Sequence, residues 1–90
     1  MAVGLIFIGT GVTQAQYEQV NNEVTPGNTL PPGMLYHAAG PAQDGWRVVQ
    51  TWESHEALDR FFKEKLGAAL QRANITVQPE VFEVINIRQA

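Results

Sequence analysis

Hydrophobic and polar residues follow two different spacings along this chain, and the spacing predicts where strands and helices lie. Residues 3–8 form a short apolar run rich in β-branched and aromatic residues, which is typical of a buried strand. Residues 34–39 and 46–52 are two further runs of strand length on either side of the turn-forming segment 40–45. These two runs should pair as an antiparallel hairpin. A last strand is expected over residues 80–88.

Two other segments repeat their apolar residues at helical spacing. The first follows Thr13, a predicted N-cap whose capping box is completed by Gln16, and one face of this helix carries Tyr17, Val20 and Val24. The second follows the N-cap Ser54 and should end in the left-handed conformation at Asn74. Its apolar stripe consists of Leu58, Phe61, Phe62, Leu66, Ala69, Leu70 and Ala73.

The resulting order of elements is β-α-β-β-α-β, without an internal linker. This order predicts an α+β fold of the ferredoxin-like kind, a four-stranded antiparallel sheet with both helices on one face. A chain of 90 residues has room for one domain, so residues 1–90 are expected to form it.

Two helices on one face leave the other face of the sheet open. If Gly40 pairs with Gly45, one face of the hairpin carries Leu35, His37, Trp46, Val48, Gln50 and Trp52. We expect this to be the open face, because the opposite set suits packing under helices: Met34, Tyr36, Ala38, Val49 and Thr51. A slip of one residue would exchange the two sets. All the strands are apolar on both sides, so we expect a homodimer through the open sheet face.

Composition narrows the function classes. Six Lys and Arg against nine Asp and Glu give a net charge of −3, which does not favour nucleic acid or an anionic membrane as partner. The third strand also lacks the Gly-and-aromatic pattern of the RNA-binding domains that share this element order. Without cysteine there is neither a disulfide framework nor a thiolate metal site. The apolar N-terminus is too short to span a bilayer, so we expect a cytoplasmic protein.

Several stretches together carry a resemblance to a known family. They are the strand ending in Trp52, the following Glu53-Ser54, the helix with Ala57-Leu58 and Phe61-Phe62, LYHAAGP before them, and PEVFEV near the end. With these features the chain resembles the dimeric α+β barrel superfamily. Within it, the chain is similar to the antibiotic-biosynthesis-monooxygenase-like proteins, and more narrowly to short actinobacterial members.

The resemblance implies a dimer with a pocket between each sheet and its helices or in the barrel interior. Some relatives oxidise quinol-type aromatic substrates with oxygen and without metal or flavin, and Trp52 and Gln50 match pocket-lining positions of these. Others degrade haem, using an Asn on the first strand and a His on the following helix. Here the first strand has no Asn, and Phe61 and Phe62 stand where the His is expected. The resemblance therefore favours oxidation without a cofactor over haem degradation.

His37 is the candidate catalytic residue, because an imidazole with a pKa of about 6.5 can take a proton from a substrate. The alternative is a hydrogen-bonded interior histidine. The candidate substrate-binding residues share the same strand face: Trp52, Gln50, Trp46, Leu35 and Val48. Trp52 can equally be part of the core, and Gln50 can lock a dimer instead. No metal site is expected, because His37 and His55 lie on different elements without a carboxylate to join them.

Two functions remain open at this point. One is a monooxygenase-like enzyme without cofactors that acts on an aromatic or polyketide-like substrate. The other is a non-catalytic dimeric module that binds a small apolar ligand or has a structural role.

Overall fold

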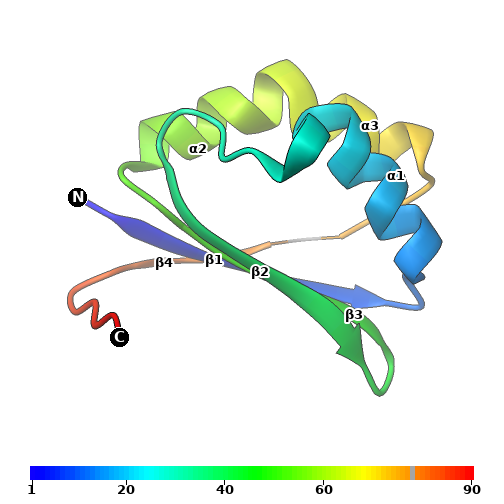
Figure 1. Cartoon of the computed structure of the whole chain (residues 1–90), viewed down its shortest axis with the longest axis horizontal. Coiled ribbons are helices and arrows are strands. Elements are labelled where there is room, and N and C mark those ends of the chain that lie inside the picture. The colour runs from blue at the N-terminus through cyan, green and yellow to red at the C-terminus, as the bar shows by residue number, and fades with distance from the viewer. Residues whose placement is uncertain (78) are drawn as a thin grey trace.

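A four-stranded antiparallel sheet carries the helices on one of its faces (Figure 1). The computed structural model describes residues 1–77 and 79–90. The strands stand in the spatial order β2-β3-β1-β4. Their bounds are Val3–Thr10 for β1, Met34–Ala42 for β2, Gly45–Trp52 for β3 and Glu80–Glu83 for β4. The predicted α+β, ferredoxin-like arrangement is therefore confirmed.

The first helix, α1 (Gln14–Val24), begins at the predicted capping box. The Thr13 hydroxyl accepts a hydrogen bond from the Gln16 backbone N–H at 3.1 Å, and the Gln16 side chain accepts one from the Thr13 N–H at 3.0 Å. A short 3-10 turn, η1 (Pro26–Asn28), follows α1 and leads into the loop before β2. Val20 and Val24 of α1 are buried against the sheet.

The second helical stretch consists of α2 (His55–Phe61), the π-helical segment η2 (Phe62–Leu66) and α3 (Gly67–Arg72) in succession. Ser54 caps its start, accepting the Ala57 N–H at 3.1 Å, and Asn74 stands just beyond its end at φ 57°, both as predicted. The predicted apolar stripe is wrong at Phe62, which is 38% exposed. The wider π turn changes the helical spacing at this residue, so Phe62 turns away from the sheet.

The β2–β3 hairpin is longer and tighter than predicted. β2 continues to Ala42, and Gln43 and Asp44 are the connecting residues. His37 lies opposite Gln50, where the predicted register placed Val48, so the register differs by two residues. Because side chains alternate with a period of two, this difference keeps His37 and Gln50 on one face.

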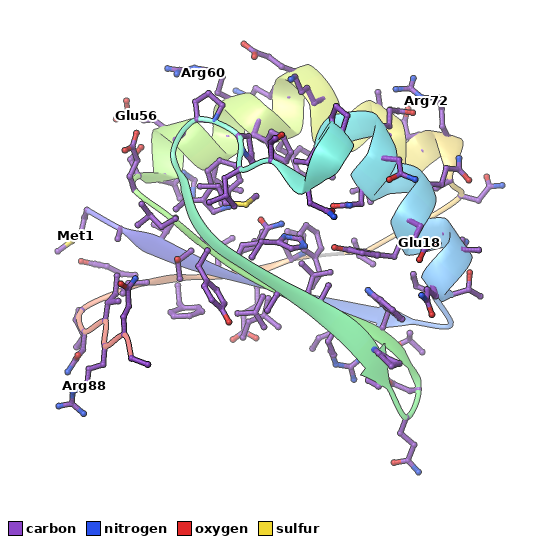
Figure 2. All side chains as sticks on the ribbon, in the orientation of Figure 1. Met1, Glu18, Glu56, Arg60, Arg72 and Arg88 are labelled. Atoms are coloured by element: carbon purple, nitrogen blue, oxygen red, sulfur yellow. The ribbon has the colours of Figure 1, made fainter. Side chains whose placement is uncertain are left out.

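The prediction of which face is open is wrong. His37, Trp46, Gln50 and Trp52 face the helices, whereas Tyr36 and its neighbours face outward. Side chains project from both faces of the sheet (Figure 2). An irregularity in β2 between Met34 and Tyr36 brings Met34 to the helix side, opposite Trp52. Leu35 lies at this irregularity and is 45% exposed. The polar side chains tolerate the inner face because they hydrogen-bond to one another there, as described below.

The outer face of the sheet is apolar in this single chain. Its exposed side chains, each between 40% and 53% accessible, are Ile8, Tyr36, Val49 and Phe82. Gly4 makes room for one of them, since a Cβ on Gly4 would lie 2.2 Å from the Phe82 ring. Phe82 therefore lies flat across β1 and extends the apolar surface to the edge strand.

The last strand is shorter than the predicted 80–88. β4 pairs with β1 in a register that puts Glu83 opposite Val3, and the Val84 N–H still reaches the Ala2 carbonyl at 2.9 Å. Ile85 and Ile87 lie outside the sheet, at 89% and 50% exposure.

Candidate functional site

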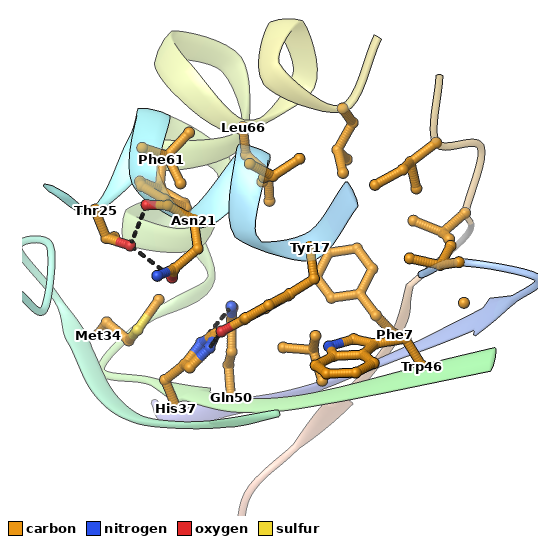
Figure 3. A pocket seen from close by; sticks show the side chains of 18 residues that line it. Phe7, Tyr17, Asn21, Thr25, Met34, His37, Trp46, Gln50, Phe61 and Leu66 are labelled. Carbon is orange, nitrogen blue, oxygen red and sulfur yellow. Dashed lines mark hydrogen bonds between the residues drawn. The ribbon is translucent and has the colours of Figure 1, made fainter. Parts of the chain in front are cut away.

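A cavity of about 80 Å³ lies between the inner face of the sheet and the helices (Figure 3). Its walls are mostly apolar. They include Phe7 of β1, Val20 and Val24 of α1, and Phe61 and Leu66 of the second helical stretch. Five polar side chains also line it: Tyr17, Asn21, Thr25, His37 and Gln50. An enclosed apolar space with few polar groups is the usual form of a small-molecule site.

Four side chains form a continuous row of hydrogen bonds along one wall. The Trp52 indole N–H donates to the Gln50 carbonyl oxygen at 2.9 Å. The Gln50 amide nitrogen lies 3.1 Å from His37 Nδ1, and His37 Nε2 lies 2.6 Å from the Tyr17 hydroxyl. Register explains the row, because His37 and Gln50 are direct cross-strand partners and Trp52 follows Gln50 on the same face. Tyr17 reaches them from α1.

The row fixes the protonation of His37. Since the Gln50 oxygen accepts from Trp52, the Gln50 NH₂ group is what faces Nδ1, so Nδ1 accepts. A neutral imidazole then carries its proton on Nε2 and donates it to the Tyr17 oxygen. The Tyr17 hydroxyl proton is left free to donate to another acceptor. Neither ring nitrogen of His37 is free to take a proton while this arrangement persists.

Burial shifts the pKa values of His37 and Tyr17. It lowers the pKa of His37 from its ordinary 6.5, since an imidazolium loses hydration inside the fold. Burial also raises the pKa of Tyr17 above its ordinary 10.0, because the phenolate would lose hydration. Both residues are therefore neutral near pH 7, which agrees with the hydrogen-bond pattern.

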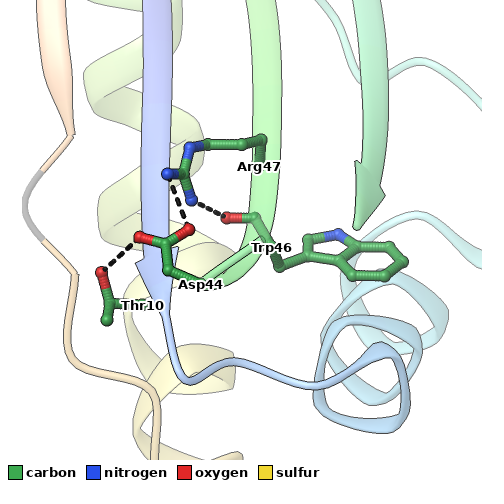
Figure 4. A network of polar contacts seen from close by, with 4 residues as sticks. All are labelled: Thr10, Asp44, Trp46 and Arg47. Carbon is green, nitrogen blue, oxygen red and sulfur yellow. Dashed lines mark hydrogen bonds and ion pairs between the residues drawn. The ribbon is translucent and has the colours of Figure 1, made fainter. Parts of the chain in front are cut away.

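Trp46 closes the cavity next to Tyr17, with the two ring centroids 5.2 Å apart. Its indole N–H is buried and has no hydrogen-bond partner in the part of the chain that the structure describes. The backbone of Trp46 is held at the hairpin end (Figure 4), where its carbonyl accepts from Arg47 at 3.1 Å and Arg47 pairs with Asp44 at 2.8 Å. Loss of hydration opposes the charge on Asp44, but hydrogen bonds from Arg47, the Asp44 backbone and Thr10 outweigh it and lower the Asp44 pKa.

A second, more polar hollow of about 260 Å³ adjoins the first near η1. The two share four lining residues, Asn21, Thr25, Met34 and His37. The Thr25 hydroxyl is 2.9 Å from both the backbone oxygen and the side-chain oxygen of Asn21, and the Asn21 amide donates to Asn28 at 2.7 Å. We call this space the outer hollow and the 80 Å³ space the inner cavity.

The structure brings together most of the predicted site residues. His37, Gln50, Trp46 and Val48 all line the inner cavity. Trp52 is fully buried behind Gln50, and Leu35 lies outside the cavity at the irregularity in β2.

Tyr17, Asn21 and Thr25 belong to the site but were not predicted as site residues. The sequence did contain a signal that Tyr17 belongs to the site. Tyr17 lies on the inward face of an amphipathic helix, where a tyrosine hydroxyl needs a hydrogen-bond partner.

Among residues 1–77 and 79–90, no group of three or more His, Asp or Glu side chains is arranged to hold a metal ion. Within the same residues, no helix has the length and apolar character needed to cross a membrane.

The fold and the position of the cavity can now be compared with those of known proteins. The chain has the fold of the dimeric α+β barrel superfamily, and the predicted resemblance to antibiotic-biosynthesis-monooxygenase-like proteins is confirmed at the level of the fold. No protein-family model matches the sequence, and no curated protein matches it.

Three solved structures illustrate the similarity of this chain to proteins of known fold. SnoaB, a cofactor-independent oxygenase from Streptomyces nogalater, is 18% identical with a TM-score of 0.63, over 99% of this chain and 94% of SnoaB. A candidate antibiotic biosynthesis monooxygenase from Deinococcus radiodurans is 13% identical with a TM-score of 0.68, over 100% of this chain and 98% of the other. A variant of MhuD solved with two manganese protoporphyrin IX molecules per active site is 24% identical with a TM-score of 0.62, over the full length of both chains.

The residues of the inner cavity do not fit a haem. His37 has both ring nitrogens engaged, by Gln50 and by Tyr17, so it offers no lone pair to an iron. On α2, Phe61 occupies the space toward the sheet and packs on Trp52 with ring centroids 5.2 Å apart.

Proposed function

We propose that the inner cavity binds a small planar aromatic molecule and promotes its oxidation by oxygen without a cofactor. The observation that carries this proposal is the hydrogen-bonded row, which ends at a free hydroxyl proton of Tyr17 inside an enclosed apolar space. The shared fold with SnoaB, a cofactor-independent oxygenase, supports it.

The reaction needs no reductant from the protein. A phenol with a free para position reacts with one O₂ to give a para-quinone and one water. One oxygen atom enters the ring, the other leaves as water, and the substrate supplies all four electrons. The step that a protein must help is loss of the phenol proton, since the anion gives an electron to oxygen far more readily.

Tyr17 is the group that meets the substrate in this proposal. Its hydroxyl donates to the phenolate oxygen, and His37 Nε2–H donates to the Tyr17 oxygen from behind, which strengthens Tyr17 as a donor. A donor set in an apolar site favours the anion over the neutral phenol. The proton leaves to water through the outer hollow.

The predicted role of His37 as the base itself stays a prediction. It would require the proton of His37 to move from Nε2 to Nδ1. The Gln50 amide would then have to turn over and give up its bond with Trp52. Structure and chemistry together therefore favour Tyr17 as the contact residue and His37 as the positioning residue.

Oxygen uptake with a panel of phenols, naphthols and anthrones tests the proposal. We expect quinone formation at one O₂ per substrate in metal-free buffer. Tyr17→Phe should lower kcat about 10²-fold, the usual effect of losing one oxyanion donor. Tyr36→Phe is the matched control, because Tyr36 lies on the outer sheet face at 53% exposure and outside the cavity. Absence of turnover across the panel would refute the enzymatic proposal, and equal loss in both variants would refute the role of Tyr17.

A second candidate function is ligand binding without catalysis. The observation that favours it is the lack of a free base in the row, since both His37 nitrogens are engaged. Saturable binding of the same compounds, without oxygen uptake, would support this function instead.

We also infer that the outer sheet face packs on a second copy of the chain. The support is the apolar surface of Ile8, Tyr36, Val49 and Phe82, which leaves large hydrophobic side chains in water in the single chain. Sedimentation should give a homodimer, and Ile8→Glu should dissociate it. Phe62→Glu, on an exposed helix position away from the sheet, is the control and should stay dimeric. A monomeric wild type would overturn the inference.

A further inference from the structure

Trp46 carries a polar group that the proposed function leaves unused. Its side chain is only 8% exposed, it lines the inner cavity, and its indole N–H has no hydrogen-bond partner among residues 1–77 and 79–90. A buried donor without a partner costs free energy, so such a group calls for an explanation. The nitrogen edge of the indole is turned toward Tyr17 in Figure 3.

The row of four side chains has a hydrogen-bond donor left over, whereas its acceptors are used. Its acceptors are taken, because His37 Nδ1 accepts from Gln50 and the Gln50 oxygen accepts from Trp52. The Tyr17 oxygen accepts from His37 Nε2. What the row and Trp46 still offer to a ligand is therefore two donors, the Tyr17 O–H and the Trp46 N–H.

We propose that the Trp46 N–H binds an oxygen atom of the ligand, and that this oxygen carries no proton. The ligand would present either an aromatic carbonyl or a ring oxyanion at this point. The proposal rests on the function proposed above and adds Trp46 as a specificity-determining contact. It names the chemical character of the ligand oxygen.

Both donors belong to side chains that line the inner cavity. The Tyr17 and Trp46 rings are neighbours, with centroids 5.2 Å apart and planes tilted by 31°, yet they come from α1 and β3. The Trp46 backbone is anchored by Arg47 and, through Arg47, by Asp44 at the hairpin end. The indole is thus fixed before the ligand arrives, which limits the entropy cost of binding.

The same arrangement explains how unsuitable ligands would be rejected. A hydrocarbon of the same shape leaves the Trp46 N–H unpaired in the complex, as it is in the free protein. A site that hydrogen-bonds its ligand discriminates strongly against the analogue without the polar atom, because its own buried groups then stay unpaired. Trp46 would therefore select ligands by their oxygen atom and not by their aromatic ring.

The test compares acetophenone with α-methylstyrene, two molecules of one shape that differ in a carbonyl oxygen against a methylene group. Calorimetric titration of the wild type should show tighter binding of acetophenone. Trp46→Phe should shrink this preference roughly threefold to tenfold, the factor expected for one neutral hydrogen bond. Tyr36→Phe is the control variant and should keep the full preference.

A second readout does not depend on any variant being stable. The chain has two tryptophans, so a ¹H–¹⁵N spectrum contains two indole N–H signals, and the Trp52 proton is already bonded to Gln50. Acetophenone should move the Trp46 signal downfield, and α-methylstyrene should not.

The outcomes separate the two proposals. Equal affinity of the wild type for both probes, with no downfield shift, would overturn the donor inference and leave aromatic binding intact. Failure of both probes to bind would overturn the donor inference together with the proposed ligand site.

Discussion

The two tryptophans give a matched pair of substitutions that tests the hydrogen-bond assignment. Trp52 and Trp46 are both buried, at 0% and 8% exposure, and both are changed to Phe. They differ in one respect that matters here. The Trp52 N–H donates to Gln50 at 2.9 Å, whereas the Trp46 N–H has no partner. We expect Trp52→Phe to be clearly the more destabilising change.

The magnitude follows from the atoms removed. Each substitution deletes two ring carbons and one N–H, and the carbons account for about 1.6 kcal/mol of lost burial at either site. Trp52→Phe also leaves the Gln50 oxygen without its donor, at a cost of about 1–3 kcal/mol. Trp46→Phe instead removes a buried unpaired donor, which returns about 1–3 kcal/mol. The free energies of unfolding of the two variants should therefore differ by about 2–6 kcal/mol.

Urea unfolding at one fixed protein concentration measures this difference, since association of copies would otherwise shift the apparent stability. The slope with urea should be unchanged, so the difference appears in the midpoint. A difference below about 1 kcal/mol, less than the cost of one unpaired buried polar group, would refute the assignment. In that case either Gln50 does not depend on Trp52, or the Trp46 N–H has a partner in solution.

The remaining predictions concern backbone, cap and pH. Gly45→Ala should destabilise the fold by about 2 kcal/mol or more, because Gly45 has φ 152° and a Cβ there would lie 2.2 Å from the Gly9 carbonyl. Gly40→Ala, where a Cβ would meet nothing within 4 Å, is the control in thermal unfolding. Thr13→Ala should cost about 1 kcal/mol in the same assay, and no loss would contradict the capping box. Since burial lowers the pKa of His37, the unfolded chain binds more protons than the folded one below about pH 6.5. The wild type should therefore lose stability as the pH falls from about 7 to 5 and His37→Gln should lose less of it, while identical pH profiles would contradict the lowered pKa.

Local signals in the sequence were sufficient for the element order and the helix starts. Thr13 with Gln16, and Ser54, are caps whose chemistry involves only residues within three positions, so their geometry follows from the local sequence. The end of β4 could not be predicted from the local sequence, because the length of this strand depends on pairing with β1, which is distant along the chain.

The open face was assigned wrongly because both faces of the hairpin are mainly apolar. Alternation alone therefore could not say which set lies under the helices. From the sequence alone, His37 and Gln50 are separate polar side chains without an evident partner. In the structure each is a partner of the other, and Trp52 and Tyr17 complete the row, so all four meet their hydrogen-bonding needs inside.

This mutual satisfaction also explains why one polar wall stands in an otherwise apolar interior. Any one of the four side chains, buried alone, would cost more than it contributes, because an unpaired polar group in the core is destabilising. Joined in sequence, Trp52, Gln50 and His37 each fix the orientation of the next, and the last free proton appears on Tyr17. Trp46 falls outside this chain of partners although it lies beside Tyr17. Its N–H thus stays without a partner among the described residues at the inner cavity, which is the arrangement expected if a ligand oxygen is the missing partner.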